Sequence, residues 1–128
     1  MIAKRNTTGY VNNNDDNDLS CEIQVQVQDC QNTNKSLLGL LDTSAHGAYV
    51  KRSMLKHAKH IIEDCNIQVR GRNQRQTITQ IATFFVKLID FTGARTVKIR
   101  AYVEDHAVGK HDIVIGMKTI QQLSLIHI

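Results

Sequence analysis

The stretch "LLGLLDTSAHGAYVKRSM", residues 37–54, places an acid, Asp42, directly after the most apolar run of the chain. Moving an unpaired carboxylate out of water is costly, so Asp42 needs either a structural partner or a chemical role. The ordinary structural role of an acid before Thr-Ser is that of a turn or cap residue. The apolar run in front of Asp42, together with a second one at "VIGM" (114–117), favours a chemical role.

The composition is that of one globular domain. The 128 residues are 41% hydrophobic and 22% charged, with no Trp and no Pro, so the chain can bury a real but modest core. The net charge of +4 invites a nucleic-acid interpretation. However, the basic residues are scattered and are not interleaved with the aromatics on which single strands stack. Nucleic acid is therefore not expected to be the main ligand.

Cysteine and histidine placement argues against metal or disulfide chemistry. Cys21, Cys30 and Cys65 form no CxxC pair. His57 and His60 are three residues apart, with no second pair of ligands on another arm, so a solvated face is the better interpretation than a metal site. We expect no metal, no cofactor and a reducing, cytoplasmic setting. No run reaches membrane-spanning length, and the start of the chain has no signal-peptide core.

The chain divides into a polar leader and one domain. Residues 1–19 are rich in Asn and Asp, and we expect them to be disordered. Residues 20–128 form the predicted domain. The segment "EIQVQVQD" (22–29) alternates apolar and polar residues, which is typical of a half-buried strand. The run "SLLGLL" (36–41) predicts a strand covered on both faces.

The rest of the domain is also expected to be mostly β. Residues 49–62 fit a short helix or turn with an apolar stripe. A hairpin follows, with one strand ending at Arg70, a tip near Gly71–Asn73 and a long return through Leu88. The alternation in 97–103 predicts another strand, and "HDIVIGMKTIQQL" (111–123) predicts a buried strand, a Gly and a short helix. The predicted class is all-β with one or two short helices.

The final five residues, "SLIHI" (124–128), are expected to form an apolar strand. A strand with nothing to follow it leaves an unpaired edge, which a chain must cover. A homodimer that shares a terminal sheet would cover it.

In this order and spacing, three motifs resemble the retropepsins, the aspartic proteases of retroviruses and of long-terminal-repeat retrotransposons, most closely gypsy-like elements. "LLDTSAHGAYVKRSMLK" (40–56) is similar to the family's active-site segment, "DIVIGMKTIQQL" (112–123) to its Ile-Leu-Gly segment, and "VRGRNQRQTIT" (69–79) lies where the flap belongs. The resemblance covers about residues 22–128. It implies a closed β-barrel of the acid protease fold that works as a homodimer.

The resemblance further implies an aspartic endopeptidase that cleaves peptides or a polyprotein by means of an activated water. Two aspartates so close together cannot both ionise, so one stays protonated while the other acts as base. The chain has one such motif, so the second acid would be Asp42 of another copy, as C2 symmetry supplies. A substrate would add as an extended strand between flap and floor.

The same resemblance assigns roles to further residues. Thr43 would hydrogen-bond across the dimer axis, and Ala45 would offer an N–H near the carboxylate. A loop-packing group, comprising Val114, Ile115 and Gly116, would support the active-site loop. The flap would comprise Arg70, Gly71, Arg72, Asn73 and Gln74, and it would close over the substrate.

Two features depart from the family pattern. Ser44 replaces the family's Gly, so its hydroxyl would either crowd the substrate or donate a hydrogen bond to Asp42. The flap has a single glycine, Gly71, among arginines, which favours acidic or polar substrates. One alternative is therefore a weakened or inactive retropepsin-like domain that serves as a dimerisation or peptide-binding module. A second alternative is an unrelated β-barrel.

Two sharper alternatives find less support. Ser44 and His46 suggest a serine hydrolase, but no G-x-S-x-G elbow surrounds the serine and no acid is placed to orient the histidine. Asp112 is expected to be a cap or surface acid, and an ion pair with Arg52 is its rival role.

Overall fold

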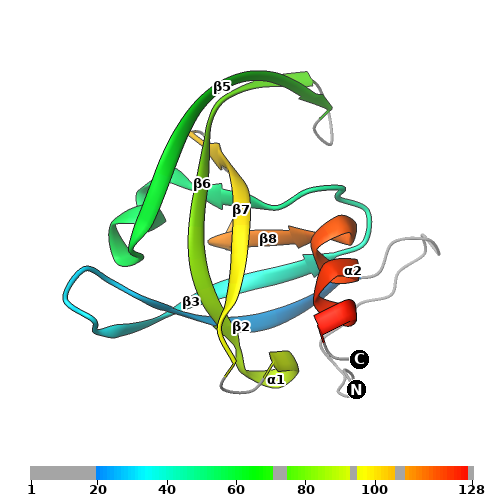
Figure 1. Cartoon of the computed structure of the whole chain (residues 1–128). Helices are drawn as coiled ribbons and strands as arrows, with labels where there is room; N and C mark the ends of the chain where they lie inside the picture. The colour runs from blue at the N-terminus through cyan, green and yellow to red at the C-terminus, as the bar shows by residue number, and fades with distance from the viewer. Residues whose placement is uncertain (1–19, 71–74, 93–94, 106–108, 127–128) are drawn as a thin grey trace.

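The computed structural model of the chain describes residues 20–70, 75–92, 95–105 and 109–126 (Figure 1). Most of them lie in seven strands: β2 (Ser20–Gln28), β3 (Asn34–Asp42), β4 (Tyr49–Lys51), β5 (His60–Arg70), β6 (Arg75–Leu88), β7 (Val97–Glu104) and β8 (Ile113–Gly116). The helical segments are short: η1 (Arg52–His57), α1 (Ile89–Thr92) and α2 (Met117–Ile126). The predicted all-β class is confirmed.

The strands form one sheet in the order β2-β3-β8-β4-β7-β6-β5, and β2 also pairs with β6. The pairings therefore lead from β2 through β3, β8, β4, β7 and β6 back to β2. Two pairs, β3 with β8 and β4 with β7, are parallel, and the others are antiparallel. As a result β3 lies between β2 and β8, and its carboxyl end is held from both sides.

Side chains that alternate along the strands build the core. β7 follows the expected period of two, burying every second residue from Val97 to Val103. β2 does the same with Ile23, Val25 and Val27. Phe84 on β6 is the largest of the fully buried side chains in the described residues. The polar leader, residues 1–19, lies outside the described residues.

β3 differs from the strand covered on both faces that the sequence predicted. Leu37, Gly39 and Leu41 are buried, whereas Leu38 and Leu40 are half-buried. The reason is that one face of β3 packs on the core and the other is only partly covered. Gly39 faces the core, and a Cβ there would lie 2.8 Å from Val25 Cγ2.

The expected helix or turn over residues 49–62 is also only partly correct. The segment divides into β4, the 3₁₀ helix η1 and the first residues of β5. Of the predicted stripe, Leu55 and Ala58 are buried, but Ile61 is 70% exposed. The apolar residues that follow Ala58 belong to a strand, so they alternate between faces and no longer share one side.

The predicted terminal strand at 124–128 is wrong as far as residue 126, because α2 continues through Ile126. No Gly or Pro interrupts the chain between Met117 and Ile126, so nothing in this stretch stops the helix once it has begun. Residues 127–128 lie outside the described residues. A dimer built on this terminal strand therefore loses its structural basis.

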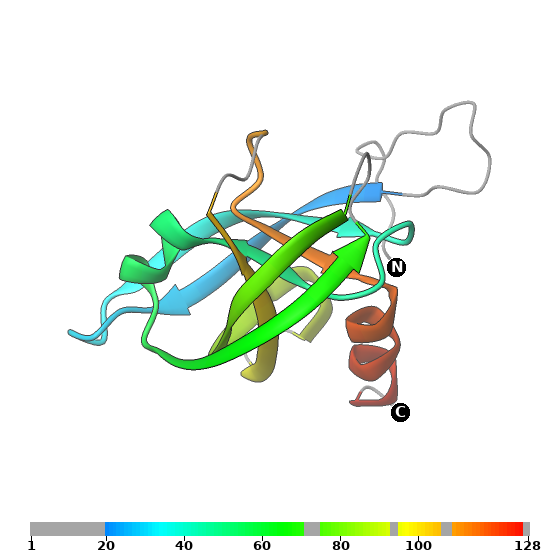
Figure 2. The same ribbon diagram turned by 90° about the horizontal axis from the view of Figure 1, so that it is seen from above.

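β5 and β6 form a long hairpin that arches over the other strands (Figures 1 and 2). The pairing runs from His60 with Phe84 to Arg70 with Arg75, and it is interrupted by a bulge between Asp64 and Ile67. A bulge bends a strand and increases its twist. In Figure 1 the hairpin bends toward the side of the molecule where β3 and β8 end and α2 begins.

None of the helices in the described part of the chain is both long enough and apolar enough to cross a bilayer.

Candidate active site

Asp42 is the last residue of β3 and is 3% exposed, the one charged side chain buried among the described residues. Its backbone is aligned with Ser20 of β2 on one side and with Gly116 of β8 on the other. The apolar run of β3 places it there, because the run passes through the core to bury its own side chains. The predicted catalytic residue thus lies at a strand end held by two neighbouring strands.

Ser44 donates two hydrogen bonds to the same oxygen of Asp42. Its backbone N–H lies 2.9 Å from Asp42 Oδ1, and its hydroxyl Oγ lies 2.6 Å from that atom. The second distance falls in the range of a charge-assisted O–H···O⁻ bond. Of the two effects expected for the hydroxyl of Ser44, donation to Asp42 is therefore the one the structure contains.

Ala45 has a different role from the one expected. Its N–H donates to the main-chain oxygen of Asp42 at 3.1 Å, while the N–H on the carboxylate comes from Ser44. These two bonds fold the chain into a tight turn after β3. As a result the N–H of Ser44, and not that of Ala45, donates to the carboxylate. Thr43 is half-buried, and its bond across a dimer axis stays a prediction.

The start of α2 holds the loop that follows Asp42. The Met117 N–H donates to Ala45 O at 2.8 Å, and the Lys118 N–H donates to His46 O at 3.1 Å. The first N–H groups of a helix have no partner within it, so they are available for such bonds. These two hydrogen bonds were not predicted from the sequence, although "VIGM" indicated the end of a strand and the start of a helix.

Gly116 brings β8 against the same loop. A Cβ at this position would lie 2.3 Å from Gly47 O and 2.6 Å from Ala45 O, so no other residue fits without a shift of backbone. Ile115 is fully buried, and Val114 is half-buried, paired with Tyr49 on β4. Of the three residues predicted to support the loop, Gly116 is the one these contacts place directly against it.

The predicted flap lies mostly outside the described residues. Arg70 ends β5 and is paired with Arg75 at the start of β6. Gly71, Arg72, Asn73 and Gln74 are not among the described residues. The strands leading to them bend toward the end of the sheet that carries Asp42 (Figure 1).

The residues behind the serine-hydrolase and metal alternatives make other contacts or are exposed. The Ser44 hydroxyl donates to Asp42, and His46 is exposed. His57 lies in η1 and His60 in β5, with His60 Nδ1 placed 2.7 Å from Ala58 O. Within the described ranges, no three His, Cys, Asp or Glu side chains lie together as metal ligands would.

Asp112 caps the start of β8 by hydrogen-bonding to β3, and Arg52 pairs with other residues. Asp112 Oδ2 accepts the Leu38 N–H at 2.9 Å, and its own N–H donates to Leu38 O at 2.8 Å. Arg52 instead pairs with Asp105 and donates to Gln80. Asp112 precedes β8, so its two bonds to β3 extend the parallel pairing by one residue; this agrees with the expected cap and not with the rival ion pair.

Glu22, near the start of β2, forms ion pairs or hydrogen bonds with two residues that precede β8. Glu22 accepts hydrogen bonds from Lys110 at 2.9 Å and from His111 at 2.8 Å. These two hydrogen bonds, that of Lys110 first, lower the pKa of the Glu22 carboxyl. The group lies two residues from Ser20, the neighbour of Asp42 across the β2–β3 pairing.

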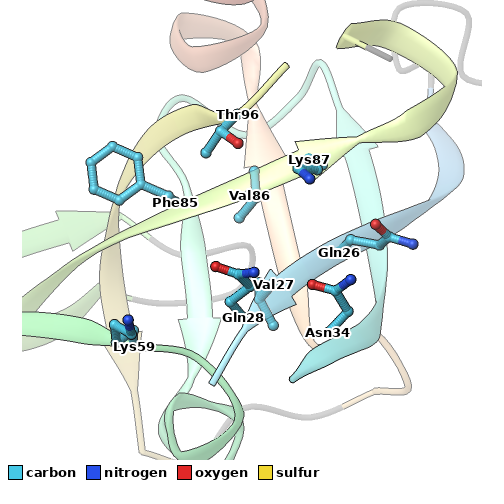
Figure 3. A pocket seen from close by; sticks show the side chains of 9 residues that line it. All are labelled: Gln26, Val27, Gln28, Asn34, Lys59, Phe85, Val86, Lys87 and Thr96. Atoms are coloured by element: carbon cyan, nitrogen blue, oxygen red, sulfur yellow. The ribbon is translucent and has the colours of Figure 1, made fainter. Parts of the chain in front are cut away.

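A shallow cleft of about 310 Å³ lies at the other end of the strands (Figure 3). Its lining residues are mostly polar: Gln26, Val27, Gln28, Asn34, Lys59, Phe85, Val86, Lys87 and Thr96. Asn34 and Asp42 are the first and last residues of β3, so the cleft is about 25 Å from the acid at ~3.3 Å per residue. The cleft is therefore not part of the site around Asp42.

No protein-family model matches the chain, and no curated protein matches it significantly. Among solved structures, a protein of unknown function (DUF785) from Legionella pneumophila subsp. pneumophila str. Philadelphia 1 is similar, with 13% sequence identity and a TM-score of 0.46. The match covers 79% of this chain and 84% of that protein's chain. The functional proposal therefore depends on the residues and geometry of this chain.

Proposed function

We propose that the chain is a retropepsin-like aspartic endopeptidase that works as a homodimer in the cytoplasm. The observation that carries the proposal is the buried Asp42 carboxylate at the end of β3, fixed between β2 and β8 and followed by a loop that Gly116 and α2 hold. A rigid, water-poor seat is what an acid needs to act as a general acid or base. The ring of strand pairings from β2 back to β2 supports the closed barrel.

In this proposal each copy contributes one Asp42 on a two-fold axis. The two carboxyls share one proton, so one is ionised while the other is protonated. The ionised member takes a proton from a bound water as the water attacks the scissile carbonyl carbon, and the protonated member gives its proton to the carbonyl oxygen. Collapse of the resulting diol breaks the C–N bond, and the proton that the first acid took from the water passes to the leaving amine.

The β5–β6 hairpin supports the extended-peptide part of the proposal. Its strands bend over the sheet toward the end that carries Asp42 (Figure 1). A peptide lying between the hairpin and the sheet would bind as an added strand, and the hairpin would exclude water from the reacting bond. Arg75, exposed at the last described rung of the hairpin, is consistent with the expected preference for acidic or polar substrates.

The experiment that tests the proposal compares the purified wild-type chain with Asp42→Asn. The wild type is expected to be a dimer, to cleave members of a peptide library at mildly acid pH and to gain thermal stability with a pepstatin-type inhibitor. Asp42→Asn keeps the size and an acceptor oxygen but not the acid, so it is expected to fold and dimerise without cleaving. A strictly monomeric wild type, or equal cleavage by both proteins, contradicts the proposal.

A second candidate rests on Ser44 at the family's glycine position. If its hydroxyl blocks the site, the chain is a retropepsin-like module for dimerisation or peptide binding. In that case the wild type dimerises without cleaving peptides, and Ser44→Gly restores cleavage.

A further inference from the structure

The hydroxyl of Ser44 donates a short hydrogen bond to the Asp42 carboxylate, 2.6 Å from Oγ to Oδ1. The same oxygen accepts the Ser44 N–H at 2.9 Å. Both donors approach one oxygen, so Ser44 distinguishes the two oxygens of the carboxylate. A backbone N–H alone would be present whatever residue stood here, whereas the hydroxyl is specific to Ser or Thr.

The backbone of the loop is held by hydrogen bonds that do not involve this hydroxyl. They are donated by the Ala45 N–H and by the first two N–H groups of α2. Gly116 packs directly on the carbonyl oxygens of the loop. Ser44 itself is exposed, so its hydroxyl has water as an alternative partner. We therefore expect its hydrogen bond to matter more for the buried carboxylate of Asp42 than for the conformation of the loop.

We propose that Ser44 is a positioning residue whose Oγ–H holds Oδ1 of Asp42 as the charged, hydrogen-bond-accepting oxygen. This inference rests on the proposed aspartic endopeptidase function. A carboxylate oxygen that accepts two hydrogen bonds favours the ionised acid. In a pair that shares one proton, such a bond fixes the orientation of the carboxylate that must accept the proton of water. Ser44 is then a working part of the site and not a defect at the glycine position.

Two titratable side chains lie on the segments that follow Asp42 and Gly116. They are His46 on the loop and Lys118 on α2, and both are exposed; the Lys118 N–H donates to His46 O through the backbone. On the neighbouring strands, the residues aligned with Asp42 are Ser20 and Gly116, which do not titrate.

The test uses the full chain with three substitutions, Ser44→Ala, Ser44→Gly and Ser44→Thr, and a peptide that the wild type cleaves. Removing a hydrogen bond to a charged group is expected to lower kcat about tenfold in the Ala and Gly variants, with KM within about twofold. Ser44→Thr restores a hydroxyl and is expected to stay within about threefold of wild type. Equal melting temperatures and dimerisation confirm that the variants fold. Equal or higher kcat in Ser44→Gly overturns the inference.

A second measurement keeps the inference separate from the proposed function. The ¹³C resonance of the Asp42 carboxyl is compared by NMR in wild type and in Ser44→Ala at one neutral pH. Because the wild-type carboxyl accepts a hydrogen bond from the Ser44 hydroxyl, its resonance is expected to be displaced when that bond is removed. Coincident resonances overturn the role of Ser44, whether or not the wild type cleaves peptides. A wild type without cleavage, but with the expected displacement, overturns only the proposed function.

Discussion

Replacing Gly116 with Ala tests whether the junction of β8 and α2 fixes the loop after Asp42. The added Cβ would lie 2.3 Å from Gly47 O and 2.6 Å from Ala45 O. Real Cβ atoms essentially never approach another atom more closely than 3.0 Å, so part of the structure would have to move. Both atoms belong to the backbone, so no side-chain rotation relieves the overlap. Either the loop moves away, or β8 and α2 do, and the bond from the Met117 N–H to Ala45 O is stretched.

The expected cost follows from these contacts. Overpacking costs about 1–3 kcal/mol, and a double overlap with backbone places Gly116→Ala near the upper end, about 3 kcal/mol. For a domain of this size such a loss lowers the melting temperature by roughly 10 °C. A total stability of about 5–15 kcal/mol leaves the variant folded at low temperature. Under the proposed function, we further expect the variant to lose peptide cleavage, because the displaced loop carries the neighbours of Asp42.

Gly47→Ala is the matched control, because it adds the same methyl group to the same loop. Its Cβ would lie 3.3 Å from Tyr102 Cε2, the edge of a side chain, so a small movement of the ring accommodates it at a cost of about 1 kcal/mol or less. Urea unfolding followed by circular dichroism gives both free energies of unfolding. If Gly116→Ala unfolds within about 0.5 kcal/mol of the control, the close approach at Gly116 does not constrain the loop.

The remaining predictions concern the supports around the site. Asp112→Ala is expected to destabilise the fold by about 1–3 kcal/mol in urea unfolding, because the Leu38 N–H loses its acceptor, whereas Asp112→Asn keeps an acceptor oxygen and should cost less. Arg52→Ala breaks the ion pair with Asp105, in which the two side chains are 43% and 50% exposed, so we expect it to lower the free energy of unfolding by less than about 1 kcal/mol. A larger loss contradicts the assignment of this ion pair to the surface. Glu22→Gln tests a carboxyl whose pKa is lowered by hydrogen bonds from Lys110 and His111. Its charged form is favoured in the folded state, so its stabilising effect is complete above about pH 4.5 and is lost as the pH falls below that value. The difference in urea midpoint between wild type and Glu22→Gln should therefore shrink on acidification, and a difference that grows refutes the assignment.

The strands and their faces were predictable where one period dominates the sequence. The alternation in β2 and β7 gave their location and buried faces, because a half-buried strand repeats every two residues. The step from "IVIG" into a helix was equally visible. The segment from Tyr49 to Ile62 was not, because a three-residue strand and a 3₁₀ turn are too short to establish a period. The end of the chain was misassigned for a related reason: four apolar residues in "LSLIHI" fit a strand and the continuation of a helix equally well.

The site was predictable in part. The apolar run before Asp42 identified the residue that is buried, since a carboxylate at the end of such a run is carried into the core. The sequence left open whether Ser44 crowds the site or donates to the acid, because that depends on a rotation about one bond. The contacts of Met117 and Lys118 with the loop depend on the meeting of segments about 70 residues apart. No local pattern reports such a meeting.

The tie between α2 and the loop has a mechanical consequence. The helix begins at the residue after Gly116, and its first N–H groups are bound to carbonyls that lie three and four residues beyond Asp42. A displacement of the start of α2 would therefore also displace the loop that follows Asp42.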